Sequence, residues 1–589
     1  MLLLASFLSS LALTWAAPTT QDPGYNCQPG QKCWPSLREW QQLNKTIDGH
    51  LFQTVPMGAP CYENSTSYNA ATCDVVENNY NNSIPRVGYY GQTYWQNWEA
   101  CGSTGCSLLS EDPSQKLYPT CSLGRLASYY VDVRNASHIS GALKFAKEHN
   151  IRISIKNTGH DFFGRSSVPN SLAIWTHNLN TFDFFSNFTA SNCPSANGKN
   201  VGEMGAGVVA GDSYRYFNTK GMDIAGGYEE SVGIAGGFGQ GGGLGDFTTT
   251  QGLMVDNAVE FEVVLASGEV KTINECNDPD LFWAMRGGGG GTFAVLTKYR
   301  IQLYPSVAIH TWNFKANFTG NQSQALHWVL EAHAENSLEW SKQLVTGSVD
   351  YYPGKVSFGL VLPSNDGSKL KAATAKFNHF ISNRSDIAVV ENSYISFANY
   401  TAFLALSSAD TRATEPAGIF SLLASRLIPR DVFSTPSGIA ALVDGVVHGI
   451  KTAAALLPLA ATSVVLETPV SNDDSQHATS AHPAWRDAIW HVIHAGEWEE
   501  RLSPAAQENA TDGFLKMLDP LKALSPGGGA YMNEAHWGEP DWQATYWGAN
   551  YEKLLEVKNC YDPTHIFDCF KCVGWRGESD PFYSCYEEW

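Results

Sequence analysis

The stretch that decides the fold is RISIKNTGHDFFGRSS, residues Arg152–Ser167. Ile151, Ile153 and Ile155 alternate with polar residues, which is the pattern of a half-buried strand. The strand leads into the turn Asn157–Asp161 (NTGHD), where a glycine allows backbone N–H groups to approach an anion closely. The pattern therefore predicts a strand followed by a loop that binds a phosphate-bearing cofactor, with one histidine at the turn.

Two further glycine-rich stretches follow in the chain. They are Gly226–Gly245 (GGYEESVGIAGGFGQGGGLG) and Asp280–Thr297 (DLFWAMRGGGGGTFAVLT). A glycine-rich turn can merely connect two strands, but three such stretches in this order favour a cofactor cradle. A Rossmann site is excluded, because no G-x-G-x-x-G lies between an early strand and helix with an acidic residue about 20 positions later.

The C-terminal part carries a third pattern. Thr545–Phe567 (TYWGANYEKLLEVKNCYDPTHIF) reads as an amphipathic helix whose Tyr551, Leu554, Leu555 and Val557 pack inward. Gly529–Trp542 (GAYMNEAHWGEPDW) precedes it.

Together these stretches resemble the vanillyl-alcohol-oxidase/PCMH superfamily of flavoproteins. The similarity is to its berberine-bridge-enzyme-like branch, in particular the secreted fungal, isoamyl-alcohol-oxidase-like members, and it spans most of residues 118–570. The resemblance implies an α+β fold. A PCMH-type FAD-binding domain is built from two parts of the chain, and a second α+β substrate domain is inserted before the C-terminal segment.

The resemblance also implies the cofactor and its attachment. In this branch the histidine at the position of His160 is bonded to the 8α-methyl group of FAD, whereas a histidine that only caps the turn is the alternative. Several relatives carry a second bond from a cysteine just ahead of the V-G of the second loop, where this chain has Glu229. A single flavin bond is therefore implied, and this departure puts any transfer of the plant alkaloid reaction in doubt.

The motifs place further cofactor-binding residues by the same resemblance. They are Lys156, Asn157, Thr158, Gly159, Asp161, Ser166, Ser231, Gly233, Ile234, Gly237, Gly241, Tyr546 and Asn550.

The segment before the C-terminal helix supplies the catalytic candidates. It resembles a strand of the fungal subgroup that faces the isoalloxazine, and it contains Tyr531 and Glu534. Either could orient the substrate or accept its proton, and a base with a near-neutral pKa would suit alcohol oxidation. Alternatively, Glu534 is a solvated or salt-bridged carboxylate. The region Val464–Arg486 aligns too poorly to place a base from the substrate domain.

Composition divides the chain into five parts. Residues 1–16 form an apolar run ending in small residues, typical of a signal peptide although no Lys or Arg precedes the run. The other parts are a Cys-rich extension (17–117), the FAD-binding domain (118–302), the substrate domain (303–525) and a segment that completes the FAD domain (526–589). Helices are expected at Lys32–Asn44, after an N-cap at Ser137, at Ser323–Glu335 and at Ala484–Ala495, and helices should dominate the substrate domain.

The cysteines indicate an oxidising compartment. All 13 follow the signal peptide and most crowd the two ends, which predicts disulfides. The odd count leaves one thiol unpaired, most simply Cys193 or Cys276. Cys569 and Cys572 could in isolation bind zinc, but no second pair completes a four-ligand site, so no metal is expected. Ten N-x-S/T sequons support secretion mildly: Asn44, Asn64, Asn81, Asn135, Asn187, Asn317, Asn321, Asn383, Asn399 and Asn509.

The bulk composition limits the partners. At 589 residues the chain is long enough for two cores, and 43% hydrophobic and 12% aromatic residues indicate an ordered protein. A net charge of −20 without a Lys/Arg run argues against nucleic acid and anionic membranes. No run after the signal peptide reaches the roughly 20 apolar residues of a membrane span, and Ile450–Val465 comes nearest. A monomer is expected.

The sequence thus predicts a secreted, glycosylated FAD-dependent oxidoreductase. It should take a hydride from a small organic substrate, an alcohol or a fungal secondary-metabolite intermediate, with dioxygen as acceptor. One alternative is a carbohydrate oxidase acting at an anomeric carbon, since the aromatic residues of 526–550 could stack on sugars. The other is an inactive secreted glycoprotein that retains a flavin fold.

Overall fold

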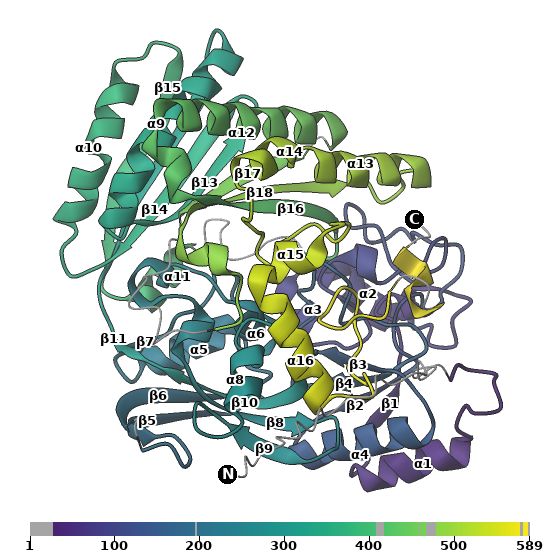
Figure 1. Ribbon diagram of the computed structural model, residues 1–589. Helices are drawn as coiled ribbons and strands as arrows, with labels where there is room; N and C mark the ends of the chain where they lie inside the picture. Colours follow the sequence, from purple (N-terminus) through teal and green to yellow (C-terminus); the bar gives the residue numbers. More distant parts are fainter. Residues whose placement is uncertain are drawn as a thin grey trace, which may run out of the picture.

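The computed structural model describes residues 27–194, 197–407, 417–457, 459–466, 479–577 and 581–586. The expected signal peptide, residues 1–16, lies outside the described residues. The protein consists of an upper body built on one large sheet and a lower body built on smaller sheets, with the C-terminal helices along one side (Figure 1).

The lower body contains two main sheets. A mixed four-stranded sheet has the order β1-β2-β4-β3, and an antiparallel five-stranded sheet has the order β5-β6-β10-β8-β9. A short ribbon pairs β7 with β11. The strands are β1 Leu51–Gln53, β2 Tyr129–Asp132, β3 Ile153–Lys156, β4 Leu172–Trp175, β5 Phe182–Thr189, β6 Asn197–Gly205, β7 Met222–Asp223, β8 Ala258–Leu265, β9 Val270–Ile273, β10 Ala294–Gln302 and β11 Tyr304–Pro305.

The expected strand before the NTGHD turn is β3, which runs parallel to β4. Helix α4 (Ala136–Glu148) packs on this sheet, and its N-cap is Asn135, whose side chain accepts from the N–H groups of Ser137 and His138. The expected cap at Ser137 is therefore wrong by two positions, because the Asn135 carboxamide already satisfies these first-turn donors. Helix α1 (Leu37–Thr46) starts later than Lys32, after a capping box of Ser36 and Glu39.

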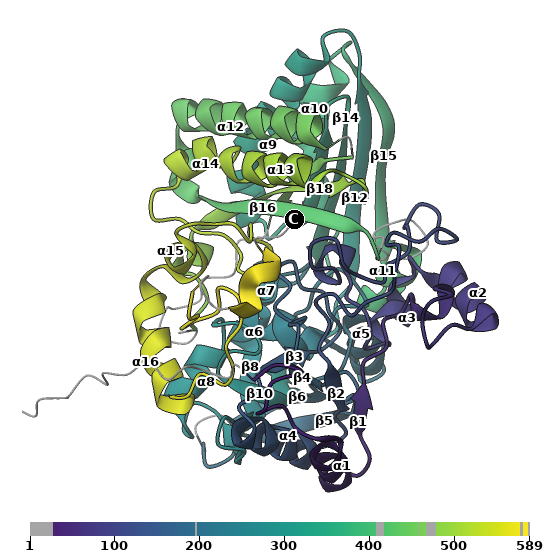
Figure 2. The same ribbon diagram turned by 90° about the vertical axis from the view of Figure 1, so that its right-hand side faces the viewer.

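The upper body is a seven-stranded antiparallel sheet in the order β15-β12-β14-β13-β17-β18-β16. Helices α9, α10, α12, α13 and α14 pack on it (Figures 1 and 2). The strands are β12 Ile309–Phe318, β13 Thr346–Tyr352, β14 Lys355–Pro363, β15 Ile387–Phe397, β16 Phe420–Pro429, β17 Ala461–Leu466 and β18 Ala488–Trp498. The helices are α9 Gln322–Lys342, α10 Ser368–Ser382, α12 Pro436–Leu456, α13 Pro504–Lys516 and α14 Asp519–Leu524.

One expectation for this region holds and another is wrong. Helices contain more of the described residues of 303–525 than strands do, and they pack on the large sheet at its centre. The segment expected to be helical at Ala484–Ala495 forms a single 3₁₀ turn, Pro483–Arg486, and then strand β18. Its run Ala488–Val492 is buried on both faces, and periodicity alone cannot separate such a strand from a buried helix. The expected helix at Ser323–Glu335 forms as α9.

Helix α12 is long and apolar enough to cross a membrane, judged by length and composition only. It extends over 21 residues, and 44% of its most apolar window is buried inside the protein. Leu442, Val446 and Ile450 belong to the core beneath the upper sheet's helices. The buried face is that of a helix packed on a sheet.

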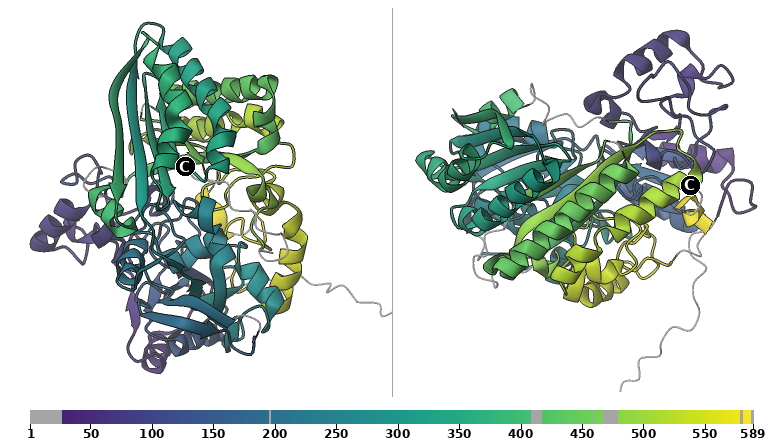
Figure 3. Two further views of the ribbon diagram at one scale, coloured as in Figure 1. Left: turned by 90° about the vertical axis from the view of Figure 1, so that its left-hand side faces the viewer. Right: turned by 90° about the horizontal axis from the view of Figure 1, so that it is seen from above.

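The C-terminal segment returns to the lower body. Helix α16 (Tyr551–Tyr561) packs against α8 (Pro279–Met285), and Leu554 is fully buried in a core that also contains residues of β8 and β10 (Figure 1). The N-terminal part, which includes α2 and is purple in Figure 3, lies on a different side of the molecule from the yellow C-terminal helices. The remaining short helices are α2 Ala70–Asn79, α3 Ser83–Val87, α5 Ala210–Asn218, α6 Gly239–Gly241, α7 Thr248–Gln251, α11 Tyr400–Ser407 and α15 Trp542–Trp547.

A disulfide joins the N-terminal and C-terminal parts of the chain, as expected, but the expectation that Cys193 or Cys276 is the free thiol is wrong. Cys193 and Cys276 are bonded to each other, and Cys560 is the free thiol of the described residues. The loops after β5 and β9 meet where Asn274 donates to the carbonyl of Ser191, at 2.9 Å. The remaining pairs are Cys27–Cys33, Cys61–Cys73, Cys101–Cys585, Cys106–Cys121 and Cys569–Cys572, the last of which takes up the pair considered for zinc.

Candidate active site

A cavity of about 650 Å³ lies between the two bodies. This volume is in the range of small-molecule sites. Its floor is made by the turn after β3, the second glycine-rich loop, Gly290, Gly291 and the turn at Tyr531–Glu534. Its roof comes from the upper sheet: Ser348, Asp350 and Tyr352 of β13, Ala461, Ser463 and Val465 of β17, and Ile493, Ala495 and Glu497 of β18.

His160 lies at the floor, on the turn that the sequence predicted. Gly159 before it has φ +89°, a conformation that favours glycine. The ring Nδ1 lies 3.0 Å from the Thr158 hydroxyl, and Nε2 lies 2.9 Å from the Ser231 hydroxyl. Burial lowers the pKa of His160 to about 3, so the imidazole is neutral at physiological pH.

The residues around this turn fit a bound FAD. Two buried side-chain atoms on the cavity wall, Asn157 Oδ1 and Ser166 Oγ, have no hydrogen-bond partner among the described residues. A buried polar atom of this kind needs a partner, which a ligand can supply. A Cβ at Gly233 would collide with the Asn157 side chain, whereas a Cβ at Gly237 would meet nothing within 4 Å. The second loop therefore packs tightly on the first and leaves open space on its cavity side.

The structure brings ten of the sequence-predicted residues to the cavity wall. They are Asn157, Thr158, Gly159, His160, Asp161, Ser166, Gly233, Gly237, Tyr531 and Glu534. Asp161 closes the first loop, because its carboxylate accepts from the N–H groups of Phe163 at 3.1 Å and Ser166 at 2.7 Å.

Six other predicted residues lie outside this lining: Lys156, Ser231, Ile234, Gly241, Tyr546 and Asn550. Lys156 Nζ points away and donates to the carbonyl of Tyr90 at 2.8 Å. Tyr546 donates to the carbonyl of His536, and Asn550 donates to that of Ala481, both at 2.9 Å. The contact of these six residues with the flavin stays a prediction.

Tyr531 and Glu534 lie in a turn, so the expected strand at Gly529–Trp542 is wrong. The N–H of Glu534 donates to the carbonyl of Tyr531 at 2.9 Å. The Tyr531 hydroxyl oxygen accepts from the N–H of Gly243 at 3.0 Å and from the Asn533 carboxamide at 2.8 Å. Two such donors make this oxygen a suitable place for negative charge.

Glu534 lies beside a buried histidine of the upper sheet. Its carboxylate is 3.8 Å from His491 Nδ1, and its side chain remains 28% exposed. Burial lowers the pKa of His491 to about 3, so this neighbour is neutral and does not form an ion pair with the carboxylate.

The roof carries carboxylates that the sequence reasoning missed. Ser463 on β17 lies opposite Asp350 on β13 and donates to its carboxylate at 2.5 Å. Burial raises the pKa of Glu497 on β18. A signal was present in β13, where Ser348, Asp350 and Tyr352 alternate with the core residues Val349 and Tyr351. Such alternation marks a face exposed to water, and in β13 that face lines the cavity.

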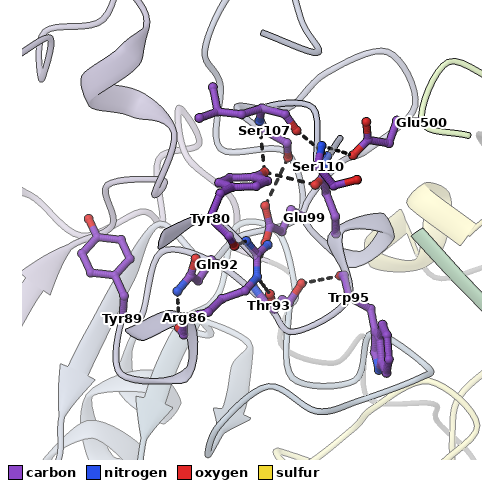
Figure 4. Close-up of polar contacts among 12 residues, drawn as sticks. Tyr80, Arg86, Tyr89, Gln92, Thr93, Trp95, Glu99, Ser107, Ser110 and Glu500 are labelled. Carbon is purple, nitrogen blue, oxygen red and sulfur yellow. Dashed lines mark hydrogen bonds and ion pairs between the residues drawn. The ribbon is translucent and has the colours of Figure 1, made fainter. Parts of the chain in front are cut away.

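The N-terminal part also reaches the site. Tyr94 stacks on His160, and Trp95 lines the cavity. The same loop is held by a buried ion pair between Arg86 and Glu99 (Figure 4). Glu99 accepts from the N–H of Thr93 at 2.9 Å, and the Thr93 hydroxyl donates to the carbonyl of Trp95 at 2.6 Å (Figure 4). No local sequence pattern predicts the stacking of Tyr94 on His160, because the two residues are far apart in the chain.

Comparison with known proteins identifies the class. The family profile described as "FAD binding domain" matches residues 127–274, and the profile described as "Berberine and berberine like" matches residues 530–571. An FAD-linked oxidoreductase of Arthroderma benhamiae is 33% identical, and the alignment covers 97% of both chains. The chain therefore belongs to the berberine-bridge-like, VAO-type family of FAD-linked oxidoreductases.

Solved structures agree. The VAO-type flavoprotein MtVAO615 from Myceliophthora thermophila C1 superposes with a TM-score of 0.83 at 30% identity, covering 93% of this chain and 97% of that one. A carbohydrate oxidase from Microdochium nivale superposes with a TM-score of 0.62 at 18% identity, over 76% of this chain and 92% of that one, which shows the fold alone. The predicted family, α+β fold and oxidoreductase class are confirmed.

Proposed function

We propose that the protein is a secreted FAD-dependent oxidase. It takes a hydride from a small neutral or cationic molecule, an alcohol or a fungal secondary-metabolite intermediate, and dioxygen is the acceptor. The observation that carries the proposal is the single cavity extending from His160 at the floor to Asp350 and Glu497 at the roof. One bond between His160 and FAD would fix the cofactor at the floor and leave the roof side for substrate.

Bound FAD would supply hydride acceptance at its ring. The protein residues have separate tasks. Glu534 accepts the proton that leaves the substrate hydroxyl as the hydride departs, and Tyr531 on the same wall orients that hydroxyl. Asp350 and Ser463 orient polar groups of the substrate, while Val465, Ile493 and other apolar residues of the roof exclude water.

The charges of the lining support the substrate class. Seven Asp or Glu residues are among the described lining residues. Asp350 and Glu497 lie on the roof and Glu534 on the turn that begins at Tyr531, and the others are Asp161, Glu229, Asp246 and Asp568. Arg165 is the only Lys or Arg among the described lining residues, and its guanidinium donates to the carbonyls of Phe570, Met532 and Lys571. Asp350, Glu497 and Glu534 lie on the side left for the substrate, where they repel carboxylate and phosphate substrates and favour neutral or cationic ones.

Oxidation of a carbohydrate at its anomeric carbon remains the second candidate. Trp95, Tyr228 and Phe403 on the cavity wall offer aromatic faces on which a sugar ring can stack. The inactive-glycoprotein alternative is disfavoured by the two unpartnered polar atoms at the floor, Asn157 Oδ1 and Ser166 Oγ.

The cellular setting belongs to the same proposal. Six disulfides among the described residues support an oxidising, extracytoplasmic compartment. We therefore include three further points in the proposal. The protein is secreted after removal of residues 1–16, it is glycosylated at some of the sequons, and it is a monomer.

A spectroscopic screen tests the proposed function. The purified yellow protein is mixed without oxygen with alcohols, sugars, amines and polyketides, and loss of flavin absorbance identifies a substrate. Bleaching by a neutral or cationic compound, followed by hydrogen peroxide release on admission of air, is expected. Bleaching only by sugars would favour the second candidate, and a colourless protein would favour the inactive glycoprotein.

A further inference from the structure

A continuous chain of hydrogen bonds leads from His160 to a buried carboxylate. The Ser231 hydroxyl lies 2.9 Å from His160 Nε2 and 2.7 Å from Glu229 Oε1. The same carboxylate oxygen accepts from the N–H of Ser231 at 3.1 Å. On the other side of the ring, the Thr158 hydroxyl lies 3.0 Å from Nδ1 and accepts from the N–H of Gly233 at 3.2 Å.

The directions of these bonds assign the tautomer of His160. A hydroxyl has one proton to donate, and an ionised carboxylate can only accept. The Ser231 proton therefore goes to Glu229, and the Ser231 oxygen accepts the proton of His160 Nε2. Because the neutral ring has its one N–H at Nε2, Nδ1 can only accept, and the Thr158 hydroxyl donates to it. His160 is thus held with a proton on Nε2 and a lone pair on Nδ1.

We infer that Ser231 and Glu229 are positioning residues for the covalent attachment of FAD, and that they receive the Nε2 proton when Nδ1 bonds to the flavin. The inference rests on the single bond at His160 in the proposed function. An imidazole that forms a bond through Nδ1 becomes positively charged unless Nε2 loses its proton. In this buried position a charged ring is costly, and Ser231 offers a route to Glu229 that avoids it.

The bonds and electrons balance as follows. Attachment forms one bond from Nδ1 to the 8α carbon and breaks one C–H bond of that methyl group and the Nε2–H bond. The Nε2 proton passes to Ser231 as the proton of Ser231 passes to Glu229. The two electrons of the broken C–H bond remain on the flavin ring until dioxygen removes them. The proton of that C–H bond and the proton received by Glu229 both leave with these electrons, so that dioxygen becomes hydrogen peroxide. The overall sum is methyl-flavin, imidazole and dioxygen giving linked flavin and hydrogen peroxide.

The neighbouring carboxylate supplies a matched control. Glu230 forms an ion pair with Arg215 of α5 at 2.5 Å, and the Arg215 side chain is about half exposed. Glu230 takes no part in the hydrogen bonds to His160. Glu229 and Glu230 are adjacent in the chain, so equivalent substitutions at both positions separate a specific role from a general disturbance of the loop.

The test measures attachment itself. Full-length secreted variants are incubated with FAD in air, and covalently held flavin is followed by its fluorescence on the denatured chain and by intact mass. We expect Ser231→Ala and Glu229→Ala to attach flavin about 10²–10⁴-fold more slowly than wild type. Ser231→Thr, which keeps a hydroxyl, should attach flavin close to normally. Sodium formate should restore attachment to Glu229→Ala, whereas Glu230→Ala should not need it.

The outcomes are distinct. Binding of FAD to each variant is measured separately by quenching of FAD fluorescence, so a misfolded chain is recognised by loss of binding. If an alanine variant does not bind FAD, attachment in Ser231→Thr and the response of Glu229→Ala to formate decide whether the inference holds. Variants at Ser231 and Glu229 that attach flavin at the wild-type rate would overturn the inference alone. A wild-type protein whose FAD is wholly released by acid would overturn the single bond as well.

Discussion

Tyr94 stacks on His160, with ring centroids 3.8 Å apart and planes inclined by 28°. The two residues come from different parts of the chain, and the N–H of Tyr94 donates to the carbonyl of Gly159 at 3.1 Å. The Cys-rich N-terminal part therefore packs directly against His160, in addition to being joined to the rest of the chain by a disulfide.

The first prediction concerns the flavin bond. His160→Ala should abolish covalent attachment, so that acid precipitation releases free FAD, whereas the wild-type precipitate stays yellow. Peptide mass spectrometry should find one flavin-bearing peptide, the one that contains His160, because Glu229 cannot form a thioether. A cysteinyl-flavin peptide would contradict the single bond. Thermal unfolding of His160→Ala verifies that the fold is retained.

Much of this floor could be predicted because its signals are local. A strand, a glycine with positive φ and a histidine at the turn are adjacent in sequence, and they form β3 and its loop. The roof could not be predicted in the same way. The contact of Ser463 with Asp350 depends on the pairing of β17 with β13, which are separated by three α-helices and three strands along the chain.

Two incorrect expectations have a similar cause. The Cys193–Cys276 bond depends on the arrangement of two loops that follow different strands of one sheet, and cysteine counts carry no such information. The Tyr531–Glu534 segment forms a turn because its polar groups bond to the second glycine-rich loop at Gly243, which cannot be inferred from local alternation.

A second prediction concerns proton transfer. If Glu534 accepts the substrate proton, Glu534→Gln should slow flavin reduction about 10²–10⁴-fold in anaerobic rapid mixing with a substrate found in the screen. The same change at Glu552, an exposed carboxylate on α16, serves as the control, and Glu552→Gln should reduce at the wild-type rate. An unchanged rate in Glu534→Gln would make Glu534 a structural carboxylate and leave Tyr531→Phe as the decisive variant.

A third prediction concerns substrate charge. Asp350→Asn removes one negative charge from the roof while keeping the shape that Ser463 contacts. For a cationic substrate, KM should rise about tenfold, which corresponds to roughly 1.4 kcal/mol, and for a neutral substrate it should change little. Steady-state oxygen consumption measures both. The same change at exposed Asp183 on β5 should affect neither, and equal effects on both kinds of substrate would argue against charge selection.

The last prediction concerns the buried Lys156. Burial lowers the pKa of Lys156 to about 7, while its Nζ donates to the carbonyls of Tyr90 and Gln92. Because the folded pKa is below the unfolded value, the unfolded chain binds more protons between about pH 7 and the lysine's ordinary pKa near 10.5. This group therefore makes the free energy of unfolding rise with pH in that window, by at most about 1.4 kcal/mol per pH unit.

Lys156→Met lacks this titration, so its free energy of unfolding relative to wild type should be highest near pH 6 and should be clearly lower at pH 9. Denaturant unfolding at both pH values measures the difference between the two proteins, and other titrating groups cancel in it. Lys147→Met, at an exposed position of α4, should show a pH-independent difference. A difference for Lys156→Met that does not vary between pH 6 and pH 9 would show that the folded protein leaves this ammonium group as easily protonated as in water.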